Sequence, residues 1–116
     1  MLFPTKDLAW IGDAKAAYDR FPPAVKKAFG YALYLAQIGR FPLGAKALKG
    51  FGNAKVVELS REYAGNAYRV VYSVHLERAI CVLHCFQKKS KKGSAMDASD
   101  LATIKRKLGE ILKEAD

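Results

Sequence analysis

Residues 79–92, AICVLHCFQKKSKK, predict a strand that is apolar on both faces and that ends in a cluster of cations. Apolar, strand-forming residues fill its first part, as they do in a strand that is covered on both sides. Four of the five positions 88–92 are lysines: Lys88, Lys89, Lys91 and Lys92. Such a strand brings positive charge to one end of a sheet, where a polyanion can bind. The alternative interpretation is a solvated lysine run that only ends the strand.

Residues 67–74, AYRVVYSV, predict the neighbouring strand, because their side chains alternate between two faces. The link to residues 79–88 is short, so the two strands should pair antiparallel. Residues 55–62, KVVELSRE, predict a third strand, and Gly65-Asn66 makes the turn after it. The alternation puts Arg69 on the face opposite Tyr68, so two adjacent strands should direct positive charge to one place.

Two helices are expected before these strands. Asp13 should cap a short helix that ends near Arg20, after a short strand or extended lead-in at residues 7–11. A longer helix is expected over residues 23–38, between Pro22-Pro23 and Gly39. Helical spacing gives this second helix a broad apolar face, which comprises Val25, Ala28, Phe29, Ala32, Leu33, Ala36 and Ile38, with Tyr31 and Tyr34 added.

Residues 41–53, FPLGAKALKGFGN, predict a loop, because proline and glycine interrupt them. A final helix should begin at Asp97 or Ser99, and its apolar residues follow helical spacing. The element order predicts one α+β domain over residues 1–116, with a small antiparallel sheet, two N-terminal helices and one C-terminal helix. We expect the helices to cover one face of the sheet and to leave the other face concave and free.

The 116-residue chain has a formal net charge of +9, which indicates a nucleic acid or an acidic protein as partner. Residues 1–96 hold 16 Lys or Arg against 6 Asp or Glu, and residues 97–116 hold 4 against 5, so the basic surface belongs to the body of the domain. No apolar stretch reaches the roughly 18 residues of a membrane span, and the N-terminus lacks the apolar segment of a signal peptide. We expect a cytoplasmic protein with no membrane partner and with reduced cysteines.

Cys81, His84 and Cys85 raise the question of a metal site. Residues four apart on a strand are separated by about 13 Å, and alternation should point His84 to the face opposite the cysteines. Zn²⁺ needs its ligands within roughly 2.3 Å of one centre. We therefore interpret the cysteines as buried thiols and His84 as a core residue, and we expect no metal and no small-molecule cofactor.

Known catalytic motifs for phosphate, dinucleotide, serine hydrolase or zinc protease chemistry are absent from the sequence. Cationic chemistry instead suits RNA cleavage without a metal, in which the 2′-hydroxyl attacks the adjacent phosphorus. The protein then has to stabilise a phosphorane and to move two protons. Arginine can bind phosphate oxygens with its planar fork, and a lysine crowded by other cations can act as a base.

Five further residues are candidates for RNA binding. Phe86 could stack on a base or pack in the core, and Gln87 offers an amide to a base edge or a phosphate. Lys46 and Lys49, which lie in the glycine-rich loop, could line the cleft. Arg61 could contact the RNA backbone or simply face solvent.

Three segments, LKGFG at 48–52, YRVVY at 68–72 and FQKKSKK at 86–92, resemble the RelE/ParE superfamily of bacterial type II toxins, in particular its HigB-like, phage-derived branch. The resemblance extends from about Trp10 to Leu112. It implies a microbial-RNase-like fold and ribosome-dependent cleavage of mRNA, which inhibits translation and arrests growth. It also implies a cognate helix-turn-helix antitoxin that neutralises the toxin and, with it, regulates their operon.

The resemblance also implies roles for single residues. Arg69 matches the strand arginine that binds the scissile phosphate. Lys88 and Lys89 match the basic pair where the family often places its general acid, and Lys46 and Lys49 fall near its loop cations. Lys91 and Lys92 are expected to hold ribosomal RNA.

Two departures from the family pattern leave the general base open. Val56 and Glu58 stand where the best-studied relatives have lysines, and SAMD at 94–97 stands where several have a catalytic tyrosine. Two other functions therefore remain: a non-nucleolytic inhibitor of the ParE kind that poisons DNA gyrase, and a plain RNA-binding module. The antitoxin should cover the cleft beside Arg69 with an acidic or helical segment, or dock on the N-terminal helices.

Overall fold

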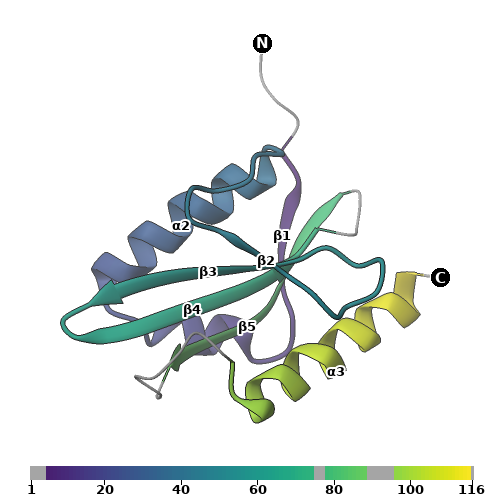
Figure 1. Ribbon diagram of the computed structural model, residues 1–116. Helices are drawn as coiled ribbons and strands as arrows, with labels where there is room; N and C mark the ends of the chain where they lie inside the picture. Colours follow the sequence, from purple (N-terminus) through teal and green to yellow (C-terminus); the bar gives the residue numbers. More distant parts are fainter. Residues whose placement is uncertain (1–4, 75–77, 89–95, 116) are drawn as a thin grey trace.

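The computed structural model describes residues 5–74, 78–88 and 96–115. In these ranges the chain forms three helices and a five-stranded, mostly antiparallel sheet, which confirms the predicted α+β class (Figure 1). The elements follow in the order β1 (Asp7–Trp10), α1 (Ala14–Asp19), α2 (Pro23–Gln37), β2 (Lys46–Leu48), β3 (Val56–Tyr63), β4 (Asn66–Ser73), β5 (Ala79–Lys88) and α3 (Ala98–Ala115). None of the described helices has the length and apolar character needed to cross a membrane.

The strand order in the sheet is β1-β5-β4-β3-β2. β3, β4 and β5 form the predicted antiparallel meander, in which Tyr72 lies opposite both Val57 and Val82. Short strands extend the sheet at both edges. β1 pairs with β5 in parallel, and β2 pairs antiparallel with β3. The loop prediction for residues 41–53 was therefore wrong at β2, because a strand of three residues is too short to show alternation.

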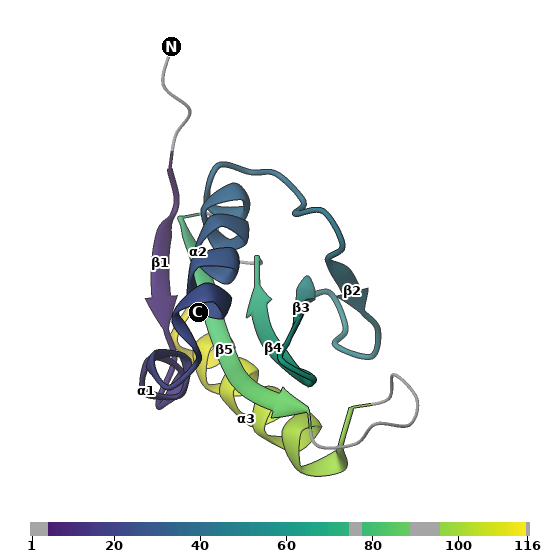
Figure 2. The same ribbon diagram turned by 90° about the vertical axis from the view of Figure 1, so that its left-hand side faces the viewer.

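Helices cover both faces of the sheet, so the prediction of one free face was wrong (Figure 2). α1 and α2 pack on the face that carries Val70, and α3 packs on the face that carries Val71. The inner strands are apolar on both faces, and exposed apolar area on either face would cost about 25 cal/mol per Å². Ile104 and Leu108 of α3 supply the cover on the second face.

The first face carries the larger core, to which α2 contributes the fully buried Phe29 and Leu33. Pro23 begins α2, and Gly39, with φ +87°, follows its end, as the sequence predicts. Tyr31 and Tyr34 are instead 65% and 50% exposed, so their assignment to the apolar face was wrong. Tyr31 follows Phe29 by two positions, which turns its side chain by about 200° around the helix.

A β-bulge in β5 changes which way its side chains point. Val71 pairs with His84 and Tyr72 pairs with Val82, so Leu83 is an extra residue in the strand. Leu83 packs on the α3 side, and His84 also reaches a residue of α3. The prediction that His84 points to the face opposite both cysteines was wrong, because alternation does not continue through the bulge and His84 lies on the same side as Cys81.

The bulge also separates the two cysteines. Cys81 packs on the α3 side and Cys85 on the side of α1 and α2. Both thiols are free and buried, and burial raises the pKa of Cys85 to about 12, so this thiol is inert at neutral pH. No three potential metal ligands cluster within the described part of the chain.

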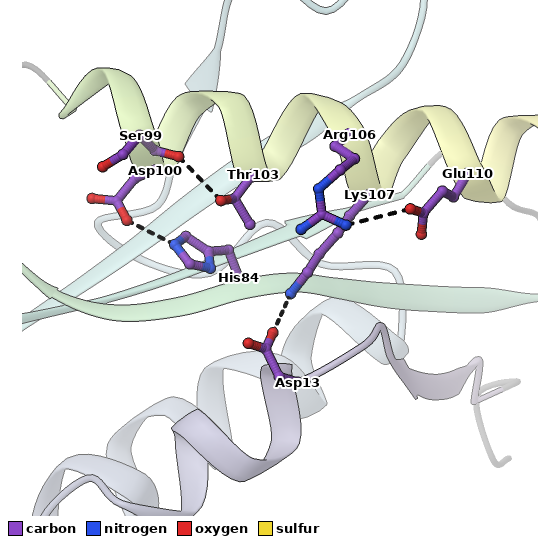
Figure 3. A network of polar contacts seen from close by, with 8 residues as sticks. All are labelled: Asp13, His84, Ser99, Asp100, Thr103, Arg106, Lys107 and Glu110. Carbon is purple, nitrogen blue, oxygen red and sulfur yellow. Dashed lines mark hydrogen bonds and ion pairs between the residues drawn. The ribbon is translucent and has the colours of Figure 1, made fainter.

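An ion pair fastens α3 to the start of α1 (Figure 3). Nζ of Lys107 lies 2.6 Å from Oδ1 of Asp13. The Lys107 side chain is only 4% exposed, whereas that of Asp13 is 82% exposed. Asp13 stands before the helix as predicted, but its carboxylate makes no capping hydrogen bond and accepts one from Lys107 instead.

The two partners of this ion pair should differ in their effect on stability. Asp13→Ala should lower the free energy of unfolding by about 1–3 kcal/mol, because it leaves the Lys107 ammonium buried without this acceptor. Lys107→Met should cost less, because Asp13 is solvated and methionine fills the stem. Asp19→Ala breaks the exposed Lys15–Asp19 pair and should cost under about 0.5 kcal/mol. Urea denaturation of the three variants at pH 7 measures these values.

The effect of Asp13→Ala should also depend on pH. The hydrogen bond from Lys107 lowers the pKa of Asp13 in the folded state. The resulting stabilisation is complete above the unfolded-state pKa of about 3.9 and is lost as the pH falls through the lowered folded value. The difference between wild type and Asp13→Ala should therefore shrink below about pH 4. A difference that stays constant down to the lowest pH at which both proteins fold would contradict this account.

Candidate functional site

The candidate site lies on the α3 face of the sheet, next to the part that α3 covers. Strand register places Ser60, Arg69 and Phe86 in one row across β3, β4 and β5. The neighbouring row contains Glu58, which lies opposite Lys46 of β2. The register therefore brings polar, charged and aromatic side chains to adjoining positions on the inner strands β3, β4 and β5 and on the edge strand β2.

Arg69 and Glu58 form the centre of this site. Nη1 of Arg69 donates a hydrogen bond to Oε1 of Glu58 at 2.9 Å, and their side chains are 16% and 7% exposed. The pair is diagonal across the sheet, since Arg69 lies opposite Ser60 and Glu58 is two residues away on β3. The ion pair holds the guanidinium in one orientation.

A second hydrogen-bond donor of Arg69, its Nε–H group, is not used by Glu58. Its Nε is buried and has no hydrogen-bond partner among the described residues. A buried N–H without an acceptor costs about 1–3 kcal/mol, and native proteins usually satisfy such groups. An anionic oxygen that reached this position would satisfy the donor, which suits a phosphate group.

Phe86 and His84 lie next to Arg69 on β5. Phe86 lies directly opposite Arg69, is half-buried, and packs partly against the smaller core. Its ring is stacked on the His84 ring, with centroids 4.8 Å apart and an interplanar angle of 22°. Stacking covers one face of each ring, so a nucleic-acid base would stack on an outer face of the pair.

Asp100 of α3 holds His84 in place (Figure 3). Nε2 of His84 lies 2.8 Å from Oδ1 of Asp100, and the two side chains are 17% and 22% exposed. The predicted core histidine is thus a partly buried polar group at the border of the site. Asp100 was not a candidate from the sequence, where its only signal is a position in the first turn of the last helix.

Lys46 and Lys88 lie on strands beside this centre, whereas Lys49 follows three residues after Lys46, toward the other end of the sheet. Lys46 begins β2 and is exposed opposite Glu58, and Lys49 is exposed directly after β2. Lys88 ends β5 opposite Ala67 and is half-buried. The predicted positions Lys89, Lys91 and Lys92 lie outside the described residues.

Arg61 and Gln87 point away from Arg69. Both lie opposite Tyr68, which belongs to the core on the side of α1 and α2. The guanidinium carbon of Arg61 is 5.9 Å from the centre of the Phe29 ring, consistent with a cation–π contact to α2. The structure therefore does not bring these two predicted RNA-binding residues to the arginine site.

Glu58 is the main residue that sequence reasoning left without a role. In the sequence it stands out only as an acid in the middle of a predicted strand. The structure buries it beside Arg69, where its carboxylate can orient the guanidinium and can also accept a proton from a nearby hydroxyl. The site therefore combines an arginine held by a carboxylate with a stacked pair of rings and nearby lysines.

The fold and this site define a small α+β protein with a nearly buried Arg69–Glu58 pair on the α3 face of its sheet. Residues 17–109 of the 116 match the family described as phage derived protein Gp49-like (DUF891), and the chain belongs to this family. It is a toxin-like family of the RelE/Gp49 type, consistent with the toxin of a toxin–antitoxin module, and it suggests an antitoxin as partner. No curated protein sequence and no solved structure matches the chain.

A double-mutant cycle on Glu58→Ala and Arg69→Ala should give a coupling energy of at least about 1 kcal/mol in the free energy of unfolding. Each single variant leaves a partly buried charge without its partner, whereas the double variant removes both. The exposed Arg106–Glu110 pair of α3 provides the matched control and should give less than about 0.5 kcal/mol. Equal coupling energies for the two pairs would show that Glu58 and Arg69 behave as a surface pair.

Proposed function

We propose that this protein is the toxin of a type II toxin–antitoxin module, of the HigB-like branch. In this proposal it is a ribosome-dependent, metal-independent mRNA endonuclease that uses the RNA 2′-hydroxyl as nucleophile. The observation that carries the proposal is the arginine of β4, which Glu58 orients and whose buried Nε lacks an acceptor among the described residues. The family assignment supports a toxin, and RelE-type toxins are RNases.

Arg69 binds the scissile phosphate in this mechanism. Its guanidinium supplies positive charge to the phosphorus-bound oxygens, where negative charge grows as the phosphorane forms. Glu58 keeps the guanidinium in place, so little reorganisation is needed when the RNA binds. Phe86 and His84 offer their stacked rings to a neighbouring base.

The chemical step needs two proton transfers. The 2′-oxygen forms a bond to phosphorus and loses its proton, and Glu58 is the carboxylate beside Arg69 that can accept this proton. The bond from phosphorus to the 5′-oxygen breaks, and Lys88 or Lys89 donates a proton to that leaving oxygen. The products are a 2′,3′-cyclic phosphate and a 5′-hydroxyl.

The remaining lysines would bind the backbone of mRNA and ribosomal RNA. Lys46 and Lys49 are exposed on the β2 side of the site, and Lys91 and Lys92 follow β5 in the sequence. Phosphate contacts of this kind make affinity depend on salt concentration. A cognate helix-turn-helix antitoxin would neutralise the toxin in the cytoplasm.

One observation favours a second function. The Glu58 carboxylate neutralises much of the Arg69 charge in the described structure, which suits a structural ion pair as well as a catalytic one. A non-nucleolytic inhibitor of the ParE kind, which poisons DNA gyrase, needs no phosphate-binding arginine. Intact mRNA together with DNA breaks in cells that produce the protein would favour this second function.

Arg69→Ala should abolish growth inhibition on induced expression. Loss of one preorganised donor to the transition state typically lowers the rate by about 10²–10³-fold. Arg20→Ala, which removes an exposed arginine after α1, is the control and should inhibit growth like wild type. Primer extension on cellular mRNA measures the cuts, and circular dichroism shows that each variant folds. Full toxicity of a folded Arg69→Ala protein would remove Arg69 from the mechanism.

Lys88 and Lys49 should affect different steps. Lys88→Ala should lower the single-turnover cleavage rate on saturating ribosome complexes by about 10²-fold or more, as the loss of a general acid does. Lys49→Ala should leave that rate unchanged, weaken binding, and reduce the slope of log affinity against log salt by about one. Equal effects on rate and binding from both variants would mean that the lysines form a simple charge patch.

A further inference from the structure

A groove opens at the end of the sheet that lies away from Arg69. It has a volume of about 470 Å³ and lies between the end of α2, the start of the α2–β2 connection and the first residues of β3. Figure 2 shows this connection passing from α2 to β2 on the same side as the start of β3 and the end of β4. A volume of this size lies within the range of about 300–1,000 Å³ that is typical of binding pockets.

The floor of the groove is apolar. Ala36, Val57 and Tyr72 line it and are only 3%, 4% and 1% exposed, so they belong to the main core. Leu48 and Val74 add half-buried apolar side chains. A large apolar side chain from another molecule would therefore extend the core when it enters this groove.

Two large apolar side chains stand exposed on the α2–β2 connection. Phe41, which lines the groove, is 61% exposed, and Leu43 is 93% exposed. Pro42 between them is fully buried, and the backbone N–H of Ala45 donates a hydrogen bond to the Pro42 carbonyl. The buried proline and this turn hold the connection in place, so a partner would meet a preformed apolar surface.

The border of the groove is cationic. Lys6, Arg40 and Lys55 line it, and no carboxylate lines it in the part of the chain that the structure describes. The combination of an apolar floor with cations at the border fits a peptide that carries acids around an apolar residue. RNA fits less well, because Tyr72 is buried and leaves Phe41 as the exposed aromatic side chain of the lining, so bases find little to stack on.

We infer that this groove docks an acidic segment of a partner protein, which places a large apolar side chain on the floor and carboxylates against Lys6, Arg40 and Lys55. In the proposed function this partner is the antitoxin. That assignment rests on the proposed function, whereas the fit of an acidic segment with an apolar side chain rests on the lining residues alone. The groove is separate from the Arg69 row, so a partner bound here blocks access to the ribosome by its bulk and leaves the arginine in place.

Selection of random twelve-residue peptides on the purified full-length chain tests this inference. The selected peptides should carry at least two acidic residues around a leucine or an aromatic residue. The best of them, made as a synthetic peptide, is titrated against wild type and variants by fluorescence anisotropy. Binding is measured without any cleavage assay, so the result stays interpretable if the protein cuts no RNA.

Arg40→Glu together with Lys55→Glu should weaken binding of this peptide by at least about tenfold. Phe41→Ser should also weaken it, and the fold should survive this change because the Phe41 side chain is 61% exposed. Lys105→Glu together with Lys113→Glu is the matched control, because both residues are exposed on α3 on the other face and the change in net charge is the same. This control should alter binding by less than about twofold, since it lowers only the long-range attraction.

Three results would overturn the inference. The first is a selection that yields no peptides or peptides without acidic residues. The second is equal weakening by the groove variant and the α3 variant, which would indicate attraction by net charge alone. The third is a twelve-nucleotide oligouridylate that binds wild type and loses more affinity in the groove variant than in the control, which would make the groove a nucleic-acid surface.

Discussion

The apolar character of both faces of the inner strands constrains the whole structure. Val70 and Val71 follow one another on β4 and are both fully buried on opposite faces, so helices must cover the sheet on both sides. α1 and α2 cover one face, and α3 covers part of the other. The rest of the second face is where β3, β4 and β5 carry polar and aromatic side chains, and the candidate site lies there. The position of α3 thus determines both the extent of the core and the extent of the site.

The Glu58–Arg69 pair gives this remaining surface its chemistry. A charge pair that is nearly buried is weak evidence for stability, because desolvation offsets much of the attraction. The pair instead orients Arg69: Glu58 holds its guanidinium, while its Nε lacks an acceptor among the described residues. In the proposed mechanism the same carboxylate is the proton acceptor of the metal-independent cleavage. The Asp100–His84 contact joins α3 to β5 beside Phe86, so the helix that closes the smaller core also positions the stacked His84 and Phe86 rings.

Local patterns in the sequence predicted the meander β3–β4–β5, α2 and the face of Arg69, because alternation and helical spacing depend only on neighbouring residues. The pairing of β1 and β2 at the sheet edges, the bulge at Leu83 and the side on which α3 packs depend on contacts between distant segments. Arg69 could be placed in the site from its strand position and from the family resemblance. The role of Glu58 could not, since it depends on the register between β3 and β4. Arg61 was expected near the site and lies elsewhere. In the sequence it is a strand arginine like Arg69, but in the structure it lies over Phe29 on the other face of the sheet.

In the proposed mechanism, Arg69 and Glu58 promote attack of the RNA 2′-hydroxyl on the adjacent phosphate without a metal ion. The end groups of mRNA fragments, produced by the purified protein on translating ribosomes in a reaction with magnesium matched between samples, test it most directly. The mechanism predicts 2′,3′-cyclic phosphate and 5′-hydroxyl ends at cuts within translated codons, identified by mass spectrometry. Fragments with 3′-hydroxyl and 5′-phosphate ends, or mRNA that stays intact, would contradict it.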